Sequence, residues 1–304
     1  MTAAGGAAAG AVPVAGFGRA GAVDLAGALD PAEVAVAFEL APGSTATLGA
    51  LLGQPEGAEA PAASAPDARP TLLVPTGSTE QHGPHLPFGT DTVIAAAVAA
   101  AVAERLGASR PAGAPARPVV VAPALPYGAS GEHQHFAGTL SIGHDALTTV
   151  LVELVRSATT WAGRIVFVNG HGGNVATLAD TVTRMISEGH DVAWVACASP
   201  AAAAIVEAQR DSHAGRIETS LLLHLAAGTV DLARATPGTV APLGELLPRL
   251  RAGGVAAVSQ TGVLGDPTGA SAAEGAALFA SMVGAVADLV SSGHPDERGR
   301  LVPA

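Results

Sequence analysis

The sequence of 304 residues contains no lysine, one cysteine and few aromatic side chains. Without a lysine amine, the chain cannot form a Schiff base, anchor pyridoxal phosphate or supply the lysine of a Walker A phosphate loop. The single cysteine, Cys197, excludes an internal disulfide and a cysteine-rich structural zinc site. Its apolar neighbours predict a buried, unreactive thiol, and a chain without disulfides fits a cytoplasmic location.

Charge is also scarce: charged residues make up 13% of the chain, and the formal net charge is −11. This acidic balance argues against a nucleic-acid partner, which needs a basic surface, and against an anionic membrane. The apolar run over 93–103 is too short to span a bilayer. The N-terminus lacks the basic start and apolar centre of a signal peptide. We therefore expect neither a nucleic-acid nor a membrane partner.

The composition divides the chain into three parts. Residues 1–68 are predicted to be a weakly ordered or flexible extension, 69–292 the folded domain and 293–304 a C-terminal tail. Within the extension, DPAEVAVAFEL predicts a short helix over 30–40, because Asp30 can cap it and proline suits the first turn.

Within the domain, short apolar runs alternate with helical stretches. Strands are expected at 71–77, 118–125, 164–170 and 191–199, and helices at 90–106, 144–161, 174–188, 216–226 and 272–290. Asn174 is expected to cap the third of these helices. Such alternation predicts the α/β class, with a mostly parallel sheet covered by helices on both faces.

Polar residues cluster directly after the predicted strands. STEQHGPH follows the first, YGASGEHQHF the second and NGHGGN the third, while DSHAGRIETS follows the fourth after an alanine-rich connection. Functional residues of parallel sheets gather at the carboxyl ends of the strands. Six of the ten histidines lie in these segments: His82, His85, His133, His135, His171 and His213. The pattern predicts one site at this edge of the sheet.

Each acidic residue of these segments has a simpler interpretation when taken alone. Glu80 and His82 could face one ion, because residues i and i+2 of an extended chain point the same way. Glu80 could instead be a solvated turn residue, and Asp91 only a helix cap. Similarly, Glu218 could point into a cleft or serve only as a partner of the helix dipole, and His171 could be incidental to a glycine turn.

Taken together, the clusters favour a metal centre. Mixed glutamate, aspartate and histidine ligands suit zinc, manganese or iron(II). The carboxylates exceed what one catalytic zinc requires, so two ions sharing Asp91 is the natural inference, and such a pair activates a water and polarises a carbonyl. No G-x-S-x-G or strand-linked G-x-G-x-x-G supports a serine hydrolase or a nicotinamide enzyme. A non-catalytic metal-binding or scaffold protein and a metal-free α/β protein stay open as rivals.

The order of the motifs resembles the creatininase family of metal-dependent amide hydrolases. GSTEQHGPHLP with Asp91, EHxxFxGT, NGHGGN and HAGxxETS follow one another over 71–290. The resemblance implies a three-layer α/β/α sandwich with a mostly parallel sheet, and a homo-oligomer, a hexamer or related ring. It also implies two divalent metal ions per subunit, Zn, Fe or Mn, bound by Glu80, His82, Asp91 and His171, with Asp91 bridging.

One position departs from the family pattern. Creatininases carry a metal-binding glutamate two residues after the histidine that matches His171, and this chain has Gly173 there. We therefore expect Glu218 to be the fifth ligand. The glycines at 172 and 173 are expected to leave more room, which suits a peptide-like substrate better than creatinine.

The resemblance also assigns the catalytic residues and the substrate. The family's proton-handling histidine falls at His213, and Glu132 and His133 lie in a loop that closes over the substrate in relatives. Within the family, the chain is most similar to peptidases that cut a modified precursor peptide during the biosynthesis of a redox cofactor and release its C-terminal Val-Tyr-derived dipeptide. The alternative is a creatininase-like amidohydrolase acting on a small cyclic amide or formamide.

Overall fold

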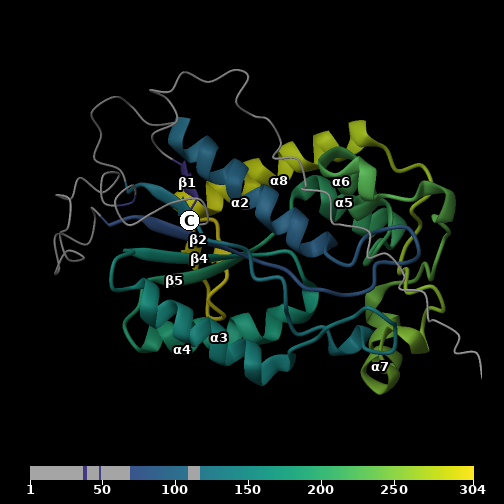
Figure 1. The fold of residues 1–304 in the computed structure, drawn as a ribbon, viewed down its shortest axis with the longest axis horizontal. Coiled ribbons are helices and arrows are strands. Elements are labelled where there is room, and N and C mark those ends of the chain that lie inside the picture. Colours follow the sequence, from purple (N-terminus) through teal and green to yellow (C-terminus); the bar gives the residue numbers. More distant parts are fainter. Residues whose placement is uncertain (1–36, 40–47, 49–68, 109–116) are drawn as a thin grey trace, which may run out of the picture. The chain divides into compact units, whose positions relative to one another are not determined.

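Five parallel strands form the sheet at the centre of the fold (Figure 1). The computed structural model describes residues 37–39, 48, 69–108 and 117–304. The strands are β1 (Ala37–Glu39), β2 (Thr71–Thr76), β3 (Val119–Val121), β4 (Arg164–Asn169) and β5 (Val192–Ala196), and their order across the sheet is β1-β3-β2-β4-β5. β2 and β4 pair over their whole length, from Thr71 opposite Arg164 to Thr76 opposite Asn169. The loops that follow these two central strands therefore leave the sheet side by side.

Helices follow the strands along the chain. The α-helices are α2 (Thr90–Ala108), α3 (Gly143–Ala158), α4 (Val175–Ser187), α5 (Pro200–Gln209), α6 (Arg216–Leu225), α7 (Leu243–Gly253) and α8 (Ala272–Ser292). Short 3-10 turns are η2 (Gly131–His133), η3 (Gly172–Asn174), η4 (Ala227–Thr229), η5 (Leu232–Arg234) and η6 (Val255–Ala257), and the chain ends with β6 (His294–Pro295) and β7 (Leu301–Val302).

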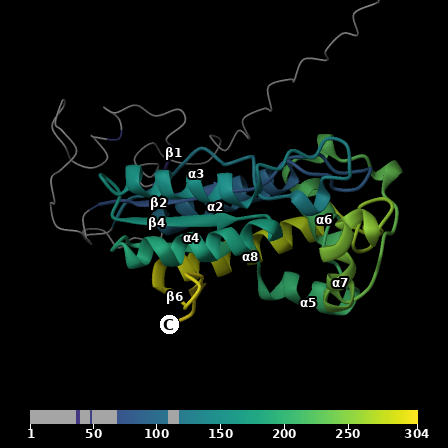
Figure 2. The same cartoon turned by 90° about the horizontal axis from the view of Figure 1, so that it is seen from below.

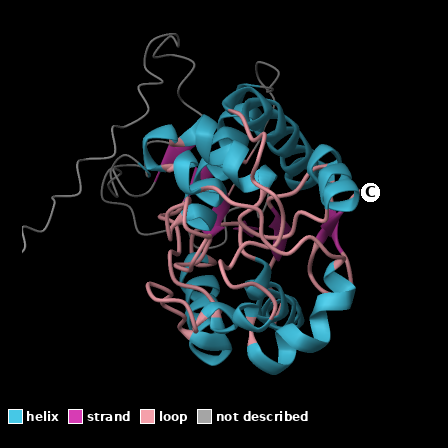
Figure 3. Cartoon of the chain, turned by 90° about the vertical axis from the view of Figure 1, so that its right-hand side faces the viewer, coloured by secondary structure: helices cyan, strands magenta, loops and turns pink. Residues whose placement is uncertain are grey.

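The two faces of the sheet carry separate apolar cores. Successive side chains of a strand point to opposite faces, so Leu73, Val166 and Val168 pack against α2, α6 and α8. Leu72 and Phe167 point the other way, against α3 and α4. Figure 1 shows these two helical layers, and Figure 2 shows α3 and α4, which form one of them. Figure 3 shows helices on both sides of the strands. The three-layer α/β/α prediction is confirmed.

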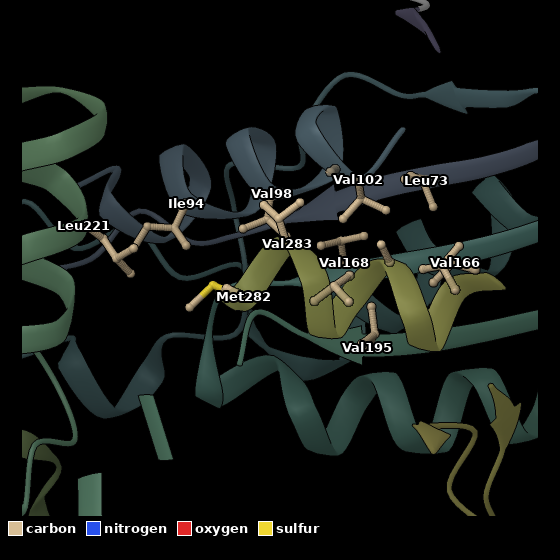
Figure 4. Close-up of a cluster of buried hydrophobic side chains, with 14 of the residues drawn as sticks. Leu73, Ile94, Val98, Val102, Val166, Val168, Val195, Leu221, Met282 and Val283 are labelled. Atoms are coloured by element: carbon tan, nitrogen blue, oxygen red, sulfur yellow. The ribbon is translucent and has the colours of Figure 1, made fainter. Parts of the chain in front are cut away.

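The core on the α2 side is built from short aliphatic side chains. Figure 4 shows Val98 and Val102 of α2 facing Val283 of α8, with Val168 and Val195 of the sheet beneath them. α8 is long and apolar enough to cross a membrane by length and composition. Its apolar side instead packs into this core, and the buried side chains there are Leu278, Met282, Val283, Val286 and Val290. One side of α8 is therefore part of the core.

The predicted helix over 30–40 is wrong where the structure describes it. Ala37–Glu39 form strand β1, which pairs in parallel with β3, and the rest of that range lies outside the described residues. The sequence around it is rich in residues that favour strands, including Val34, Val36 and Phe38. β3 would otherwise present unpaired backbone groups at the sheet edge, so this pairing prevails over local helix signals.

The other predicted strands and helices are observed, with ends shifted by a few residues. Two helices, α5 and α7, were not expected from the sequence. The C-terminal segment packs on β5: the backbone N–H of Trp194 donates to the Gly299 carbonyl at 3.0 Å, and Leu301 is buried. Cys197 packs against the α2-side core, and burial raises the pKa of its thiol. An unreactive thiol follows from that raised pKa.

Candidate metal centre

The loops after β2 and β4 bring the polar clusters together. Because Thr76 and Asn169 are paired, the chain segments leading to Glu80 and to His171 start from adjacent points. The first turn of α2 lies against both strand ends. A side chain at Gly170 would place its Cβ 2.5 Å from the Asp91 carbonyl oxygen, so only glycine allows this close approach. The backbone itself therefore holds Asp91 between the two loops.

Glu80, Asp91 and His171 form the first group of possible ligands. Their exposed fractions are 0%, 2% and 4%. The Nδ1 atom of His171 lies 3.1 Å from Oδ2 of Asp91 and 3.3 Å from Oε2 of Glu80. One potential ligand atom from each of the three residues lies within 4.8 Å of the others, which is close enough to hold one ion.

A second group lies on the other side of Asp91. The Nε2 atom of His82 is 3.0 Å from Oδ1 of Asp91 and 3.9 Å from Oε2 of Glu218. His82, His213 and Glu218 also offer ligand atoms within 4.8 Å of one another. Thus one oxygen of Asp91 faces His171 and the other faces His82. A carboxylate placed in this way can bridge two cations.

The donor set fits divalent cations. Glu80 is fully buried, and neither carboxylate oxygen receives a hydrogen bond from the residues that the structure describes. Its nearest imidazole nitrogens, on His171 and His133, are 3.3 and 3.4 Å away. A buried carboxylate that receives no hydrogen bond is costly, and a cation compensates that cost. Nitrogen and oxygen ligands of this kind suit zinc, manganese and iron(II).

The carboxylates strongly perturb the imidazoles beside them. Burial alone would lower the pKa of His82, but the nearby Asp91 carboxylate, with Glu218 and Glu80, raises it to about 10. For His171, too, the carboxylates of Glu80 and Asp91 outweigh burial and raise the pKa well above its ordinary value. Burial opposes ionisation of Asp91, yet His82 and His171 hold its pKa well below the usual range. Without a metal, protons on the imidazoles balance the carboxylates.

The predicted catalytic residues lie beside the first group. His133 of η2 places Nε2 3.4 Å from Oε1 of Glu80, and His213 places Nδ1 3.7 Å from the same oxygen. The centroids of these two rings are 4.4 Å apart. Glu132 is 34% exposed, and its Oε1 atom lies 3.6 Å from Nε2 of His171. Its pKa is raised by burial. Glu132 therefore lies between the buried cluster and solvent.

Two histidines of the predicted clusters lie outside these groups. His85 is buried, but its Nε2 atom pairs with the Thr219 hydroxyl at 2.9 Å and so ties the loop after β2 to α6. Burial lowers the pKa of His85 to about 4. His135 is exposed to solvent. The clustering of histidines in the sequence thus overstated the number that face the centre.

Several supporting residues were not anticipated. The Ser78 hydroxyl donates to Oδ2 of Asp91 at 2.6 Å. Asn174, expected to cap a helix, makes no capping bond, because its backbone is already helical with φ −74° and ψ −18°. Its amide nitrogen instead donates to the Gly77 carbonyl at 3.0 Å, and its side-chain oxygen accepts the Ala129 N–H at 2.9 Å. Asn174 therefore joins the loops that follow β2 and β3 to the start of α4. The one feature of the sequence that pointed to this role is the position of Asn174, an amide directly after the glycine turn.

The space expected at Gly173 is already filled. A Cβ at this position would lie 2.5 Å from Oε1 of Glu132 and would also meet His171 and the Ala129 carbonyl. A Cβ at Gly172 would meet nothing within 4 Å. The extra room expected at both glycines is therefore present only at Gly172. At Gly173 the missing side chain makes room for Glu132.

Gly173→Ala should disturb the centre, because its methyl group cannot enter without displacing Glu132, His171 or the backbone of Ala129. Forced overpacking of this kind costs about 1–3 kcal/mol. We expect metal affinity to fall by about tenfold or more, measured by metal titration. Gly172→Ala is the matched control and should behave like the unaltered protein. Equal behaviour of the two variants would contradict this packing.

Metal binding should release protons. The pKa of His82 is about 10 when no metal is bound, which is above the ordinary value of 6.5. Protonation of His82 therefore stabilises the folded chain fully below pH 6.5. This stabilisation is lost as the pH rises through about 10. We expect the melting temperature of metal-free protein to fall between pH 7 and 10, and that of metal-loaded protein to fall less. Calorimetric titration with zinc in buffers of different ionisation enthalpy should show proton release. Zinc binding without proton release at pH 7 would contradict a protonated His82 in the metal-free protein.

Comparison with known proteins identifies the family of this chain. The profile of the creatininase family, described as creatinine amidohydrolase, matches residues 57–290. A protein of Mycolicibacterium smegmatis named mycofactocin precursor peptide peptidase is 55% identical over 232 residues, which cover 76% of this chain and 89% of that protein.

Solved structures of creatininases are similar in fold. The structure titled creatininase Mn is 28% identical and aligns with a TM-score of 0.59 over 73% of this chain and 90% of its own. A mutant creatininase of Zn-Zn type aligns with a TM-score of 0.57 at 28% identity, over the same shares of the two chains. The family profile spans most of this chain, and a relative more than half identical covers three quarters of it. The chain therefore belongs to the creatininase family of metal-dependent hydrolases.

Proposed function

We propose that the protein is a metal-dependent peptidase that cleaves a modified mycofactocin precursor peptide and releases its C-terminal Val-Tyr-derived dipeptide. The relative that is 55% identical is named for the precursor peptide. The structural observation that carries the proposal is the buried Asp91 carboxylate, which is shared between His82 and His171. A shared carboxylate of this kind is what a pair of ions acting on an amide requires.

We assign five residues to two divalent ions, Zn, Fe or Mn. Glu80 and His171 would hold one ion, His82 and Glu218 would hold the other, and Asp91 would contribute to both. Glu218 lies in the first turn of α6, where its Oε2 atom also accepts the Ala214 N–H at 2.6 Å. That bond aims the carboxylate toward His82. When bound, the ions would activate a water and polarise the scissile carbonyl.

The protein's own residues would handle the proton and the substrate. In hydrolysis the water oxygen bonds to the carbonyl carbon, the C–N bond breaks, and a proton moves from the water to the leaving nitrogen. His213, within 3.7 Å of Glu80, is placed to carry that proton. His133 lies beside it and can donate a hydrogen bond to the substrate. Glu132, at the border with solvent, would contact the peptide as it enters.

We also propose that the enzyme acts in the cytoplasm as a homo-oligomer, a hexamer or related ring. α3 supports this proposal, because Val150 and Leu154 are both exposed one turn apart on its outer side. We therefore propose this side of α3 as one place where subunits meet.

The proposal is tested by incubating the protein with the modified precursor peptide and measuring the masses of the products. Metal-loaded protein should release one fragment with the mass of the C-terminal dipeptide derivative. Chelated protein should be inactive, and zinc, iron(II) or manganese should restore activity, because the attacking water needs the ions. Creatinine and a simple formamide are the comparison substrates. Cleavage of these alone would favour the amidohydrolase alternative, and full activity after chelation would refute metal dependence.

His213→Ala should keep the metal and lose the reaction. Removing a positioned proton carrier slows hydrolysis by about 10²-fold or more. The control is His224→Ala, an exposed histidine of α6 whose ring centroid lies 5.7 Å from that of Phe279, and it should retain the full rate. Metal content by mass spectrometry and initial rates on the precursor peptide are the two measurements. An active His213→Ala enzyme would remove this residue from the chemistry, and an inactive one without metal would make it a ligand.

A further inference from the structure

Gln81 lies between two of the proposed metal ligands, and its side chain contacts both histidines assigned to the chemistry. It is 4% exposed. Its amide nitrogen Nε2 lies 2.8 Å from Nδ1 of His133, 3.1 Å from Nε2 of His213 and 3.2 Å from the Gly262 carbonyl oxygen. Three neighbours thus compete for two amide hydrogens, and the surroundings decide which two receive them.

The orientation of the Gln81 amide is set by its other contacts. Its oxygen Oε1 accepts the Gly83 N–H at 2.9 Å. Its nitrogen faces the Gly262 carbonyl oxygen, which can only accept. Reversing the amide would break the first contact and place two oxygens together at the second. The NH₂ group therefore faces the two imidazoles.

His213 must carry its proton on Nε2. This nitrogen lies 2.8 Å from the main-chain oxygen of Gln81, which is an acceptor, so Nε2 must donate. The Gln81 amide cannot also donate to it, and its two hydrogens go to His133 and Gly262. With the proton on Nε2, Nδ1 of His213 keeps its lone pair, and this is the atom 3.7 Å from Oε1 of Glu80.

The same network gives His133 the opposite role. Its Nδ1 atom accepts the Gln81 N–H, so the ring is neutral and its proton lies on Nε2. The Nε2 atom that carries this proton lies 3.4 Å from Oε1 of Glu80, without a hydrogen bond between them. His133 and His213 are therefore the same tautomer, but they present different ends to Glu80. One offers a hydrogen and the other a lone pair.

We propose that Gln81 is a positioning residue that fixes the tautomer of His133, so that the Nε2 atom of His133 carries a hydrogen and cannot bind a metal. Glu80, His133 and His213 have ligand atoms within 4.8 Å of one another and could otherwise hold a third ion. The N–H of His133 prevents this and leaves the Nδ1 lone pair of His213 for the proton transfer. The role of His213 in proton transfer rests on the proposed function, whereas the assignment of the two tautomers does not.

The tautomers can be read directly from zinc-loaded protein labelled with ¹⁵N-histidine, using long-range ¹H–¹⁵N correlation spectra. Loss of individual signals in His133→Asn and His213→Asn variants assigns them. We expect both rings to be neutral with the proton on Nε2. A proton on Nδ1 of His133, or a doubly protonated ring, would overturn the proposal without bearing on whether the enzyme cleaves the peptide.

Gln81→Glu gives the sharper test. A carboxylate at this position accepts from Nδ1 of His133, so zinc can replace the hydrogen on Nε2, whereas His213 stays unchanged because its partner is the main-chain oxygen. We expect one additional zinc ion per chain at excess metal, and kcat lower by about tenfold or more with a smaller change in KM. Gln81→Met should show mixed tautomers of His133.

The matched control is Gln134→Glu, the same chemical change at the exposed residue next to His133. It should leave the tautomers, the zinc content and kcat unaltered. A Gln81→Glu protein with the original tautomer of His133 or the original zinc content would contradict the proposal. If the Gln81 variants do not fold, the spectrum of the unaltered protein still decides it.

Discussion

The Asp91 carboxylate, buried between His82 and His171, is the interaction on which the rest of the centre depends. Its two oxygens lie 3.0 and 3.1 Å from one imidazole on each side. Because it is removed from water, its charge must be balanced by cations, either protons on the imidazoles or metal ions. Each neighbouring group therefore depends on this one carboxylate: Glu80 and His171 are arranged on one side of it and Glu218 on the other.

The fold provides this arrangement through backbone geometry. Two paired central strands deliver the loops that carry Glu80 and His171, and α2 begins close enough to Gly170 to hold Asp91 between them. Ser78 and Asn174 then fix the loops by hydrogen bonds. The same principle applies at Gly173, where an absent side chain admits Glu132. Small residues and buried amides thus determine where the charged residues lie.

Much of this could be predicted from the sequence, because apolar runs mark the strands and parallel strands bring their following loops together. The approach of Glu80, Asp91 and His171 follows from that rule. The role of Gln81 does not, because it depends on two rings and a carbonyl contributed by distant segments. Asn174 resembled a cap, and only its backbone angles exclude that role. β1 was misassigned because its strand pairing is tertiary. α5 is an alanine-rich run with little contrast between its two sides, and α7 contains Pro248, which argues against a helix interior.

The most direct measurement is an anomalous difference map from crystals of protein loaded with zinc. The account predicts two peaks that share Asp91, one in contact with Glu80 and His171 and the other with His82 and Glu218. A single peak, or peaks that Asp91 does not reach, would contradict the shared carboxylate as the centre of the site.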